Sequence, residues 1–178
     1  MSVGRLIVRV VIGSLFVGHG AQKLFGWFGG SGLDGTDRVM AATQMYPVRP
    51  NSIAAGLTEA GCGALLVAGI ATPAAAAGLI GVMTTAIRTV HGKNGPWNSN
   101  SGWEYNAVII AALTALVDSG PGSPSFDAAR GRVRSGPGWA LGALIAGMAA
   151  STLATQLGRR NAPRSGEADE AVPSDAAA

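Results

Sequence analysis

The chain has 178 residues, of which 48% are hydrophobic and only 13% are charged, and its formal net charge is +3. This composition excludes an ordinary soluble domain and favours a membrane protein. The basic residues are scattered and form no stripe with aromatic residues, so we expect no binding of nucleic acid. The single cysteine, Cys62, cannot form an internal disulfide or a dithiol couple.

The first apolar segment covers residues 6–22 and begins beside Arg5 and Arg9. An arginine at the start of a span can lay its stem along apolar surface while its charge reaches the headgroups. A secretory signal peptide also has a basic start and an apolar run. Further apolar segments follow, however, so we expect this one to be retained as a transmembrane helix over residues 5–24.

Residues 25–52 are rich in Gly, Pro and aromatic residues, which predicts a loop at the membrane surface. Pro47 and Pro50 disfavour a continuous helix through its end. Within this loop we expect one short interfacial helix over residues 37–45. Its N-cap is predicted to be Asp34 or Thr36.

Two long apolar segments follow at residues 53–70 and 74–90. Each is close to the roughly 20 residues that a membrane span needs. Only three residues separate them, which predicts a tight helical hairpin with Pro73 at the start of its second helix. We place these two helices at residues 53–71 and 74–91.

The fourth apolar segment, residues 104–117, is short for a span. We therefore expect it to recruit Trp103 or Asp118 into its ends, or to lie where the bilayer thins. The transmembrane helix is predicted at residues 104–118.

A loop over residues 118–138 leads to a fifth apolar segment at residues 139–157, which Arg159 and Arg160 terminate. Four small residues recur at a spacing of four, which favours close contact with the bundle or with a second copy of the chain. This small-residue row consists of Gly138, Gly142, Ala146 and Ala150.

Long apolar runs without strict alternation indicate helices, because backbone groups in lipid must be hydrogen-bonded within their own element. We predict an all-α, multi-pass membrane protein: an antiparallel four-helix transmembrane bundle plus a fifth C-terminal hydrophobic helix. The expected division is a four-helix membrane domain over 1–130, an additional apolar helix over 131–158 and a disordered polar tail over 159–178.

If the helices alternate in direction, the polar ends of several spans fall on one side of the membrane. Glu59 would lie about 10 Å inside its predicted span, where an ionisable residue is a functional candidate. The predicted ligand-pocket residues are His19, Gln22, Lys23, Glu59, Arg88 and Glu104. Two other interpretations stay open: Glu59 pairs with Lys23 or Arg88 only to hold helices in register, or the charges at the loop ends are simply solvated. The His and Cys spacing predicts no metal site, and no catalytic residue is assigned.

Several of these residues carry a resemblance to the DoxX family of small bacterial membrane proteins. The matching parts, in order, are Arg9, the stretch Gly-His-Gly-Ala-Gln-Lys-Leu-Phe over 18–25, Glu59, Gly-Trp-Glu-Tyr-Asn over 102–106, Gly-Pro-Gly over 120–122 and Ser-Phe-Asp over 125–127. The resemblance covers about residues 1–130, and the fifth apolar segment departs from the four-helix pattern of the family.

The resemblance implies a redox-associated subunit in the plasma membrane, because the family takes its name from a subunit of thiosulfate:quinone oxidoreductase. It further implies binding of a quinone, or anchoring of thiol and oxidative-stress enzymes, since some members are linked to superoxide dismutase and a sulfurtransferase. The alternatives are a non-enzymatic membrane scaffold and a carrier of lipids or small solutes. With one cysteine and no cofactor motif, the chain is not expected to be a complete oxidoreductase alone, and a homo-oligomer is compatible with its small-residue row.

Overall fold

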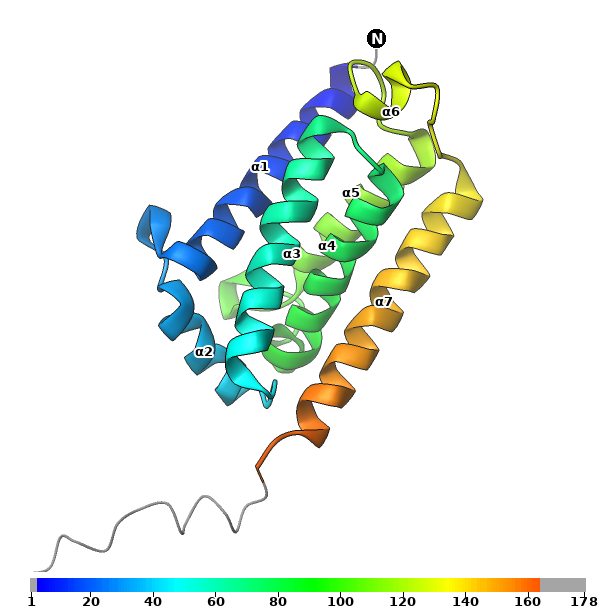
Figure 1. The fold of residues 1–178 in the computed structure, drawn as a ribbon. Coiled ribbons are helices and arrows are strands. Elements are labelled where there is room, and N and C mark those ends of the chain that lie inside the picture. The colour runs from blue at the N-terminus through cyan, green and yellow to red at the C-terminus, as the bar shows by residue number, and fades with distance from the viewer. Residues whose placement is uncertain (1–2, 164–178) are drawn as a thin grey trace, which may run out of the picture.

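The computed structural model describes residues 3–163, and its long helices lie side by side (Figure 1). The long helices are α1 (Val3–Phe25), α3 (Val48–Ala68), α4 (Thr72–Ala86), α5 (Glu104–Ser119) and α7 (Pro137–Arg160). The shorter elements are α2 (Gly32–Ala42), α6 (Phe126–Ala129), a π-helical turn that continues α4 (Ile87–His91) and 3-10 turns at Trp27–Gly29, Gly92–Asn94 and Asn98–Asn100.

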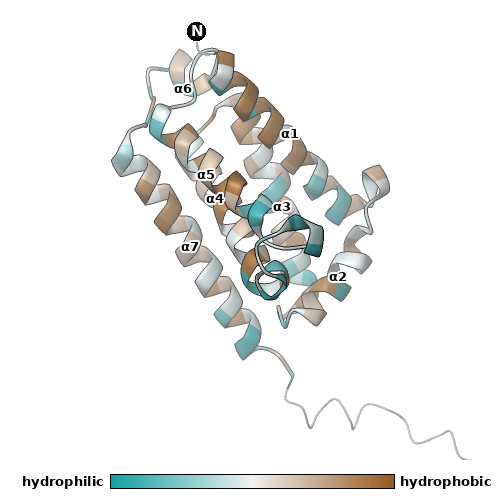
Figure 2. Cartoon of the chain, turned by 180° about the vertical axis from the view of Figure 1, so that it is seen from behind, coloured by the Kyte–Doolittle hydropathy of each residue, from teal (hydrophilic) through white to brown (hydrophobic). Residues whose placement is uncertain are grey.

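Four helical segments within the described residues are long and apolar enough to cross a membrane: α1, α3, the run Thr72–Asn94 that includes α4, and α7. Figure 2 shows hydrophobic residues along the outer faces of the long helices and hydrophilic ones gathered toward the loops. The fifth long helix, α5, has 16 residues and is therefore about 24 Å long. That length falls short of the roughly 30 Å of a hydrocarbon core.

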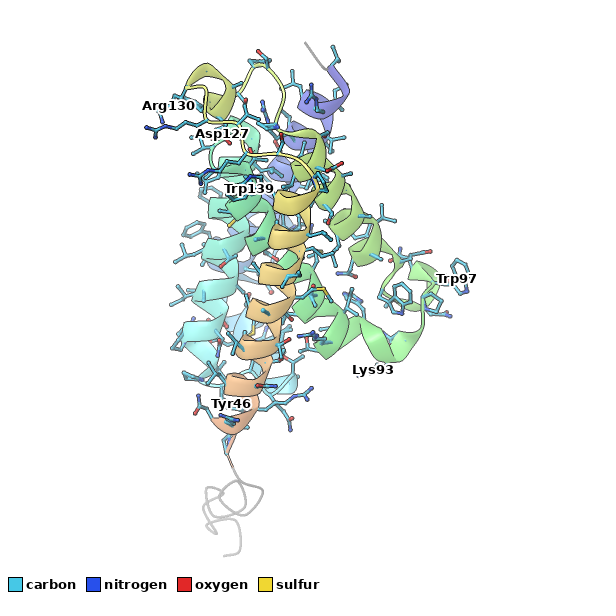
Figure 3. All side chains as sticks on the ribbon, turned by 90° about the vertical axis from the view of Figure 1, so that its right-hand side faces the viewer. Tyr46, Lys93, Trp97, Asp127, Arg130 and Trp139 are labelled. Carbon is cyan, nitrogen blue, oxygen red and sulfur yellow. The ribbon has the colours of Figure 1, made fainter. Side chains whose placement is uncertain are left out.

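The two ends of the helix cluster are built differently. The α6 end contains the start of α1, the turn between α3 and α4, and α6 with Asp127 and Arg130 (Figure 3). The α2 end contains α2, the loop that carries Lys93 and Trp97, and the last turn of α7 (Figure 3). At the α2 end the backbone N–H of Tyr46 donates a hydrogen bond to the carbonyl of Gly158, at 3.3 Å.

Glycines let α1 and α3 approach each other closely. A Cβ atom added at Gly20 would lie 2.6 Å from the carbonyl oxygen of Gly56, and one at Gly13 would lie 2.6 Å from that of Gly63. Neither glycine could gain a side chain without moving a backbone, so van der Waals contact between bare backbones holds this pair of helices together.

The apolar core occupies the half of the bundle nearer the α6 end. Its fully buried members include Leu66 of α3, Leu79 of α4 and Val117 of α5, all with 0% exposure. Ala140 and Ala143 of α7 close the core from the other side. This half of the bundle is packed with side chains.

Polar groups tie the loop before α6 to the helices beside it. Arg9 of α1 is 2% exposed, and its guanidinium donates to the carbonyls of Pro121 and Pro124. Asp127 accepts hydrogen bonds from the backbone N–H groups of Ala71 and Thr72, both at 3.0 Å, and from the Thr72 hydroxyl at 2.9 Å. Asp127 of α6 therefore caps the N-terminus of α4 from a distant part of the chain.

Burial by itself would raise the pKa of Asp127, but other effects outweigh it. The hydrogen bonds from Thr72 and Ala71 favour the ionised carboxylate, as does the nearby charge of Arg134. The pKa of Asp127 is therefore lower than its ordinary value, and the cap stays charged at neutral pH.

The loop predicted over residues 25–52 is largely helical, and the helix predicted from residue 53 begins at Val48. Pro47 is the N-cap of α3 and Pro50 lies in its first turn. The chain is not one continuous helix here, because α2 ends at Ala42 and α3 begins only after Pro47. The predicted start at residue 53 was wrong because the N–H groups of a first turn have no partner in the helix, so Pro50 costs little there. Pro73 does stand at the start of α4, as predicted.

The interfacial helix was predicted over 37–45 but runs over Gly32–Ala42. Neither predicted N-cap acts as one. The preceding residue is Ser31, whose side chain makes no cap bond, while Asp34 pairs with Arg49 at 2.8 Å. The Thr36 hydroxyl donates instead to the carbonyl of Gly32.

Helix α7 packs on α4 and α5 with another face than predicted. All four members of the small-residue row are exposed, so this row does not pack on the bundle. The contact is made instead by Ala143, Gly147 and Ser151, which are buried. A Cβ atom at Gly147 would lie 2.7 Å from the carbonyl oxygen of Ala77. Most of the predicted polar tail, from residue 164 onward, lies outside the described residues.

Candidate functional site

A cavity of about 550 Å³ lies in the half of the bundle nearer the α2 end. Its wall is built from α1, α2, α3, α4 with its π-helical turn, α5 and α7, together with the segment between α2 and α3 and the loop before α5. Most of the wall is apolar, and its polar members at one end include His19, Lys23, Glu59, His91, Tyr105 and Asn106.

The wall of this cavity contains an ion pair between α1 and α3. Nζ of Lys23 donates to Oε2 of Glu59 at 2.6 Å. The Glu59 side chain is 3% exposed and that of Lys23 is 31% exposed, so the carboxylate is buried and the ammonium is partly open. Of the partners predicted for Glu59, the structure selects Lys23.

The close approach of α1 and α3 is what brings this pair together. Gly56 and Ala60 flank Glu59 on α3, and Gly20 of α1 lies against both of them. Because Lys23 is almost one turn beyond Gly20 on the same helix, its side chain reaches across to the carboxylate. A larger residue at position 20 would push the two charges apart.

His19 also lines the cavity, while Gln22 does not. Nδ1 of His19 and Oε1 of Gln22 are 3.0 Å apart. Nε2 of Gln22 donates to the carbonyl of Phe28 at 3.2 Å. Gln22 thus orients the His19 ring and stabilises the turn after α1. It supports the cavity from outside the wall.

Arg88 and Glu104 lie outside the cavity wall. Nη1 of Arg88 donates to the hydroxyls of Thr152 and Ser151 on α7, at 2.7 and 3.2 Å. The carboxylate of Glu104 accepts the backbone N–H of Asn98 at 2.6 Å and closes the loop before α5. The predicted polar residues therefore have three separate roles. Lys23 and Glu59 form a pair in the cavity wall, Arg88 joins the π-helical turn to α7, and Glu104 closes the loop before α5.

Several polar residues of the wall were not among the predicted pocket residues, including Asn106, His91 and Ser151. Asn106 is 5% exposed, and its amide donates to the sulfur of Met83 at 3.4 Å. His91 holds the loop through Nδ1 and the carbonyl of Ser101 at 2.7 Å. The position of Asn106 at the start of an apolar helix was a usable signal. Ser151 could not be identified, because its role depends on how α7 is rotated.

The polar groups of the wall suit an uncharged polar headgroup. Lys23 Nζ and the Asn106 amide are donors, while Glu59 and the histidine nitrogens can accept. Within residues 3–163, no three His, Cys, Asp or Glu side chains are grouped as a metal site would require.

A protein-family model, DoxX, matches residues 4–92, which is half of the chain. The match runs from α1 through the π-helical turn and includes Arg9, His19, Lys23 and Glu59. It ends before the 102–106 stretch and before α7. No curated protein and no solved structure matches the chain.

Proposed function

The chain belongs to the DoxX family and is a multi-pass membrane protein, and from that premise we propose that it is a redox-associated subunit that binds a quinone headgroup. The observation that carries the proposal is the Lys23–Glu59 pair, with a buried carboxylate and a partly open ammonium, in the wall of a cavity. A volume of about 550 Å³ falls within the roughly 300–1,000 Å³ typical of small-molecule sites.

The residues of the wall fit such a headgroup. Each carbonyl oxygen of a quinone needs a hydrogen-bond donor, and the wall offers the Lys23 ammonium and the Asn106 amide. Glu59 accepts one ammonium proton of Lys23, which leaves two protons on Nζ able to donate to a ligand. Glu59 also provides an opposite charge for the ammonium, which lies in a mostly apolar wall.

A quinone, when bound, would take up two electrons and two protons, the electrons coming from a reductant that a partner enzyme supplies. The part played by this chain is to bind, to orient and to exclude water. His19 is oriented by Gln22 and gives the wall an imidazole that can donate or accept a hydrogen bond. Glu59 positions the Lys23 ammonium, so its loss would misplace the donor.

The test is binding of a tailless quinone, 2,3-dimethoxy-5-methyl-1,4-benzoquinone, to the purified chain in nanodiscs. Glu59→Gln is expected to weaken binding at least about tenfold, because it removes the charge that positions Lys23. Glu104→Gln is the matched control, since Glu104 lies outside the cavity, and it is expected to bind as the unaltered chain does. Equal affinity of the Glu59 variant, or no binding by the unaltered chain, would contradict the proposal.

For the membrane topology we propose an antiparallel bundle of α1, α3, α4 and α5, with α7 as an additional fifth helix outside the DoxX-like domain of residues 1–130. Two single-cysteine variants in a Cys62→Ala background test it. Ala74→Cys at the α6 end and Lys93→Cys at the α2 end should react with an impermeant maleimide from opposite sides. Reaction of both from one side would rule out this topology.

We further propose the plasma membrane as the location and soluble redox enzymes, a superoxide dismutase and a sulfurtransferase, as partners. Purification in mild detergent followed by mass spectrometry tests these partners. Their recovery from a chain that binds no quinone would instead favour a scaffold.

A further inference from the structure

The cavity is long and has two chemically different ends. It follows α4 and its continuation from His91 back to Gly78, a distance of about 20 Å along the helix axis. Its polar end is formed by His91 and Asn106, and the charged pair lies further along the wall, since Thr58, next to Glu59, is 3.5 Å from the Cβ position of Gly78. Around Gly78, Gly81 and Val82 the wall consists mainly of small and apolar residues, and the hydroxyl of Thr85 is turned to the carbonyl of Gly81, to which it donates at 2.9 Å.

The apolar end opens sideways between α3 and α7. Ala54 of α3 and Ala150 of α7 belong to the cavity wall, yet both are exposed at the surface of the bundle. Helices α3 and α7 both pack on α4 and make few contacts with each other, which leaves the cavity open between them. Helix α7 rests on α4 and α5, and near its end it meets the chain before α3 at Tyr46 and Gly158.

This opening lies at the depth of lipid chains. Ala54 is six residues from the start of α3, about 9 Å along the axis, and Ala150 is ten residues from the end of α7, about 15 Å. In a hydrocarbon core about 30 Å thick, both positions face acyl chains when α3 and α7 span the bilayer.

We propose that this apolar arm, the tail groove formed by Ala54, Gly78, Gly81, Ala150 and Ala154, holds the hydrocarbon tail of a membrane lipid whose headgroup lies at the Lys23–Glu59 pair. This inference rests on the proposed headgroup site and names its ligand class: a headgroup with one long apolar tail that enters sideways from the bilayer. The small side chains leave the room that a tail occupies, and the continuity of the cavity links the tail to the polar end.

Filling the groove from either wall tests the proposal. The probes are decylubiquinone and the tailless quinone with the same headgroup, both measured with the full chain in nanodiscs. Ala150→Phe and Ala54→Phe are expected to weaken binding of decylubiquinone at least about tenfold, and to change binding of the tailless quinone less than about threefold. Partitioning into the disc is the same for all variants, so it does not affect this comparison.

Each variant has a matched control on its own helix. Ala149 and Ala64 are also exposed alanines but do not line the cavity, so Ala149→Phe and Ala64→Phe should bind both probes like the unaltered chain. If groove and control variants bind decylubiquinone equally while Glu59→Gln weakens binding of both quinones, the tail groove is overturned and the headgroup site stands.

If no quinone binds, the proposed function is contradicted. A second probe then still tests the tail groove. A long-chain fatty alcohol with a diazirine in its tail carries the hydrocarbon chain without the quinone. Crosslinks are expected in residues 48–58 and 147–158 and should be lost in Ala150→Phe but kept in Ala149→Phe. Labelling spread evenly over all outer helix faces, or unchanged in the Ala150 variant, would overturn the tail groove.

Discussion

The two ends of the bundle each hold a cation of α1, buried at Arg9 and partly open at Lys23, and each cation has a different kind of partner. At the α6 end Arg9 is surrounded by backbone carbonyls from the loop before α6, and the half of the bundle next to it is a packed apolar core. At the α2 end Lys23 meets a carboxylate on a neighbouring helix, beside a cavity. Backbone wrapped around a charge fills space and fixes a loop. A side-chain pair between two helices leaves the space next to it open, and that is where a ligand can bind.

The largest effect is expected from breaking the pair at the α2 end. Lys23→Met leaves Glu59 buried without its partner, which typically costs roughly 3–5 kcal/mol. The double variant Lys23→Met with Glu59→Gln should recover much of this, because no isolated charge remains. Thermal unfolding in detergent measures both, with the exposed Lys93→Met as control. If the single change at position 23 left the midpoint unaltered, the pair would contribute little to stability.

The next largest effect concerns the glycine contact that positions the pair. Gly20→Ala places a methyl group 2.6 Å from a backbone oxygen, and such overpacking costs roughly 1–3 kcal/mol. Gly18→Ala is the matched control: nothing lies within 4 Å of its Cβ position, so better helix propensity should raise stability by roughly 0.5–1 kcal/mol. Opposite shifts of the unfolding midpoint are expected. If the two variants shifted the midpoint equally, α1 and α3 could move apart without a loss of unfolding free energy.

At the α6 end, Asp127→Asn should destabilise the chain by about 1 kcal/mol, because the amide keeps only one acceptor oxygen and loses the charge that strengthens the hydrogen bonds from Ala71 and Thr72. The pKa of Asp127 is lowered in the folded chain, so its contribution is present above the pKa of the unfolded state and is lost as the pH falls through the folded pKa. Acid should therefore destabilise the unaltered chain more than it destabilises the Asp127→Asn variant. If the unaltered chain and the Asp127→Asn variant had the same dependence of stability on pH, the Asp127 carboxylate would not stabilise the start of α4.

The smallest effect is expected from the outer face of α7. Gly142→Leu meets nothing within 4 Å of its Cβ, so the unfolding free energy of the monomer should change by less than about 0.5 kcal/mol. Gly147→Leu, aimed at the backbone of Ala77, should be clearly destabilising. The small-residue row was also predicted to contact a second copy of the chain. Sedimentation in detergent tests this contact by showing whether Gly142→Leu alters a complex of two chains.

The long helices and the Lys23–Glu59 pair could be predicted because they depend on apolar length and on depth within a span. The start of α3 could not, since Pro50 is expected to break a helix unless the first turn is known to begin at Val48. The face of α7 that packs was also beyond prediction. This helix has small residues all round, so its sequence offers more than one suitable contact surface, and the choice depends on Gly81 and Ala77 of α4. Arg88 was misplaced for the same reason: its partners are on α7.

The Arg9 contact also sets an order of events during synthesis. Its partner Pro121 lies 112 residues further along the chain, so at about 5–20 residues per second the arginine waits roughly 6–20 s for it. Glu59 follows Lys23 after only 36 residues, or roughly 2–7 s. The first helix therefore enters the bilayer with a charge that its own neighbours cannot yet satisfy, and Arg9 has to reach toward the headgroups in the meantime. The α2 end is thus the first to be joined during biogenesis, and closure at Arg9 comes only once α5 has emerged from the ribosome.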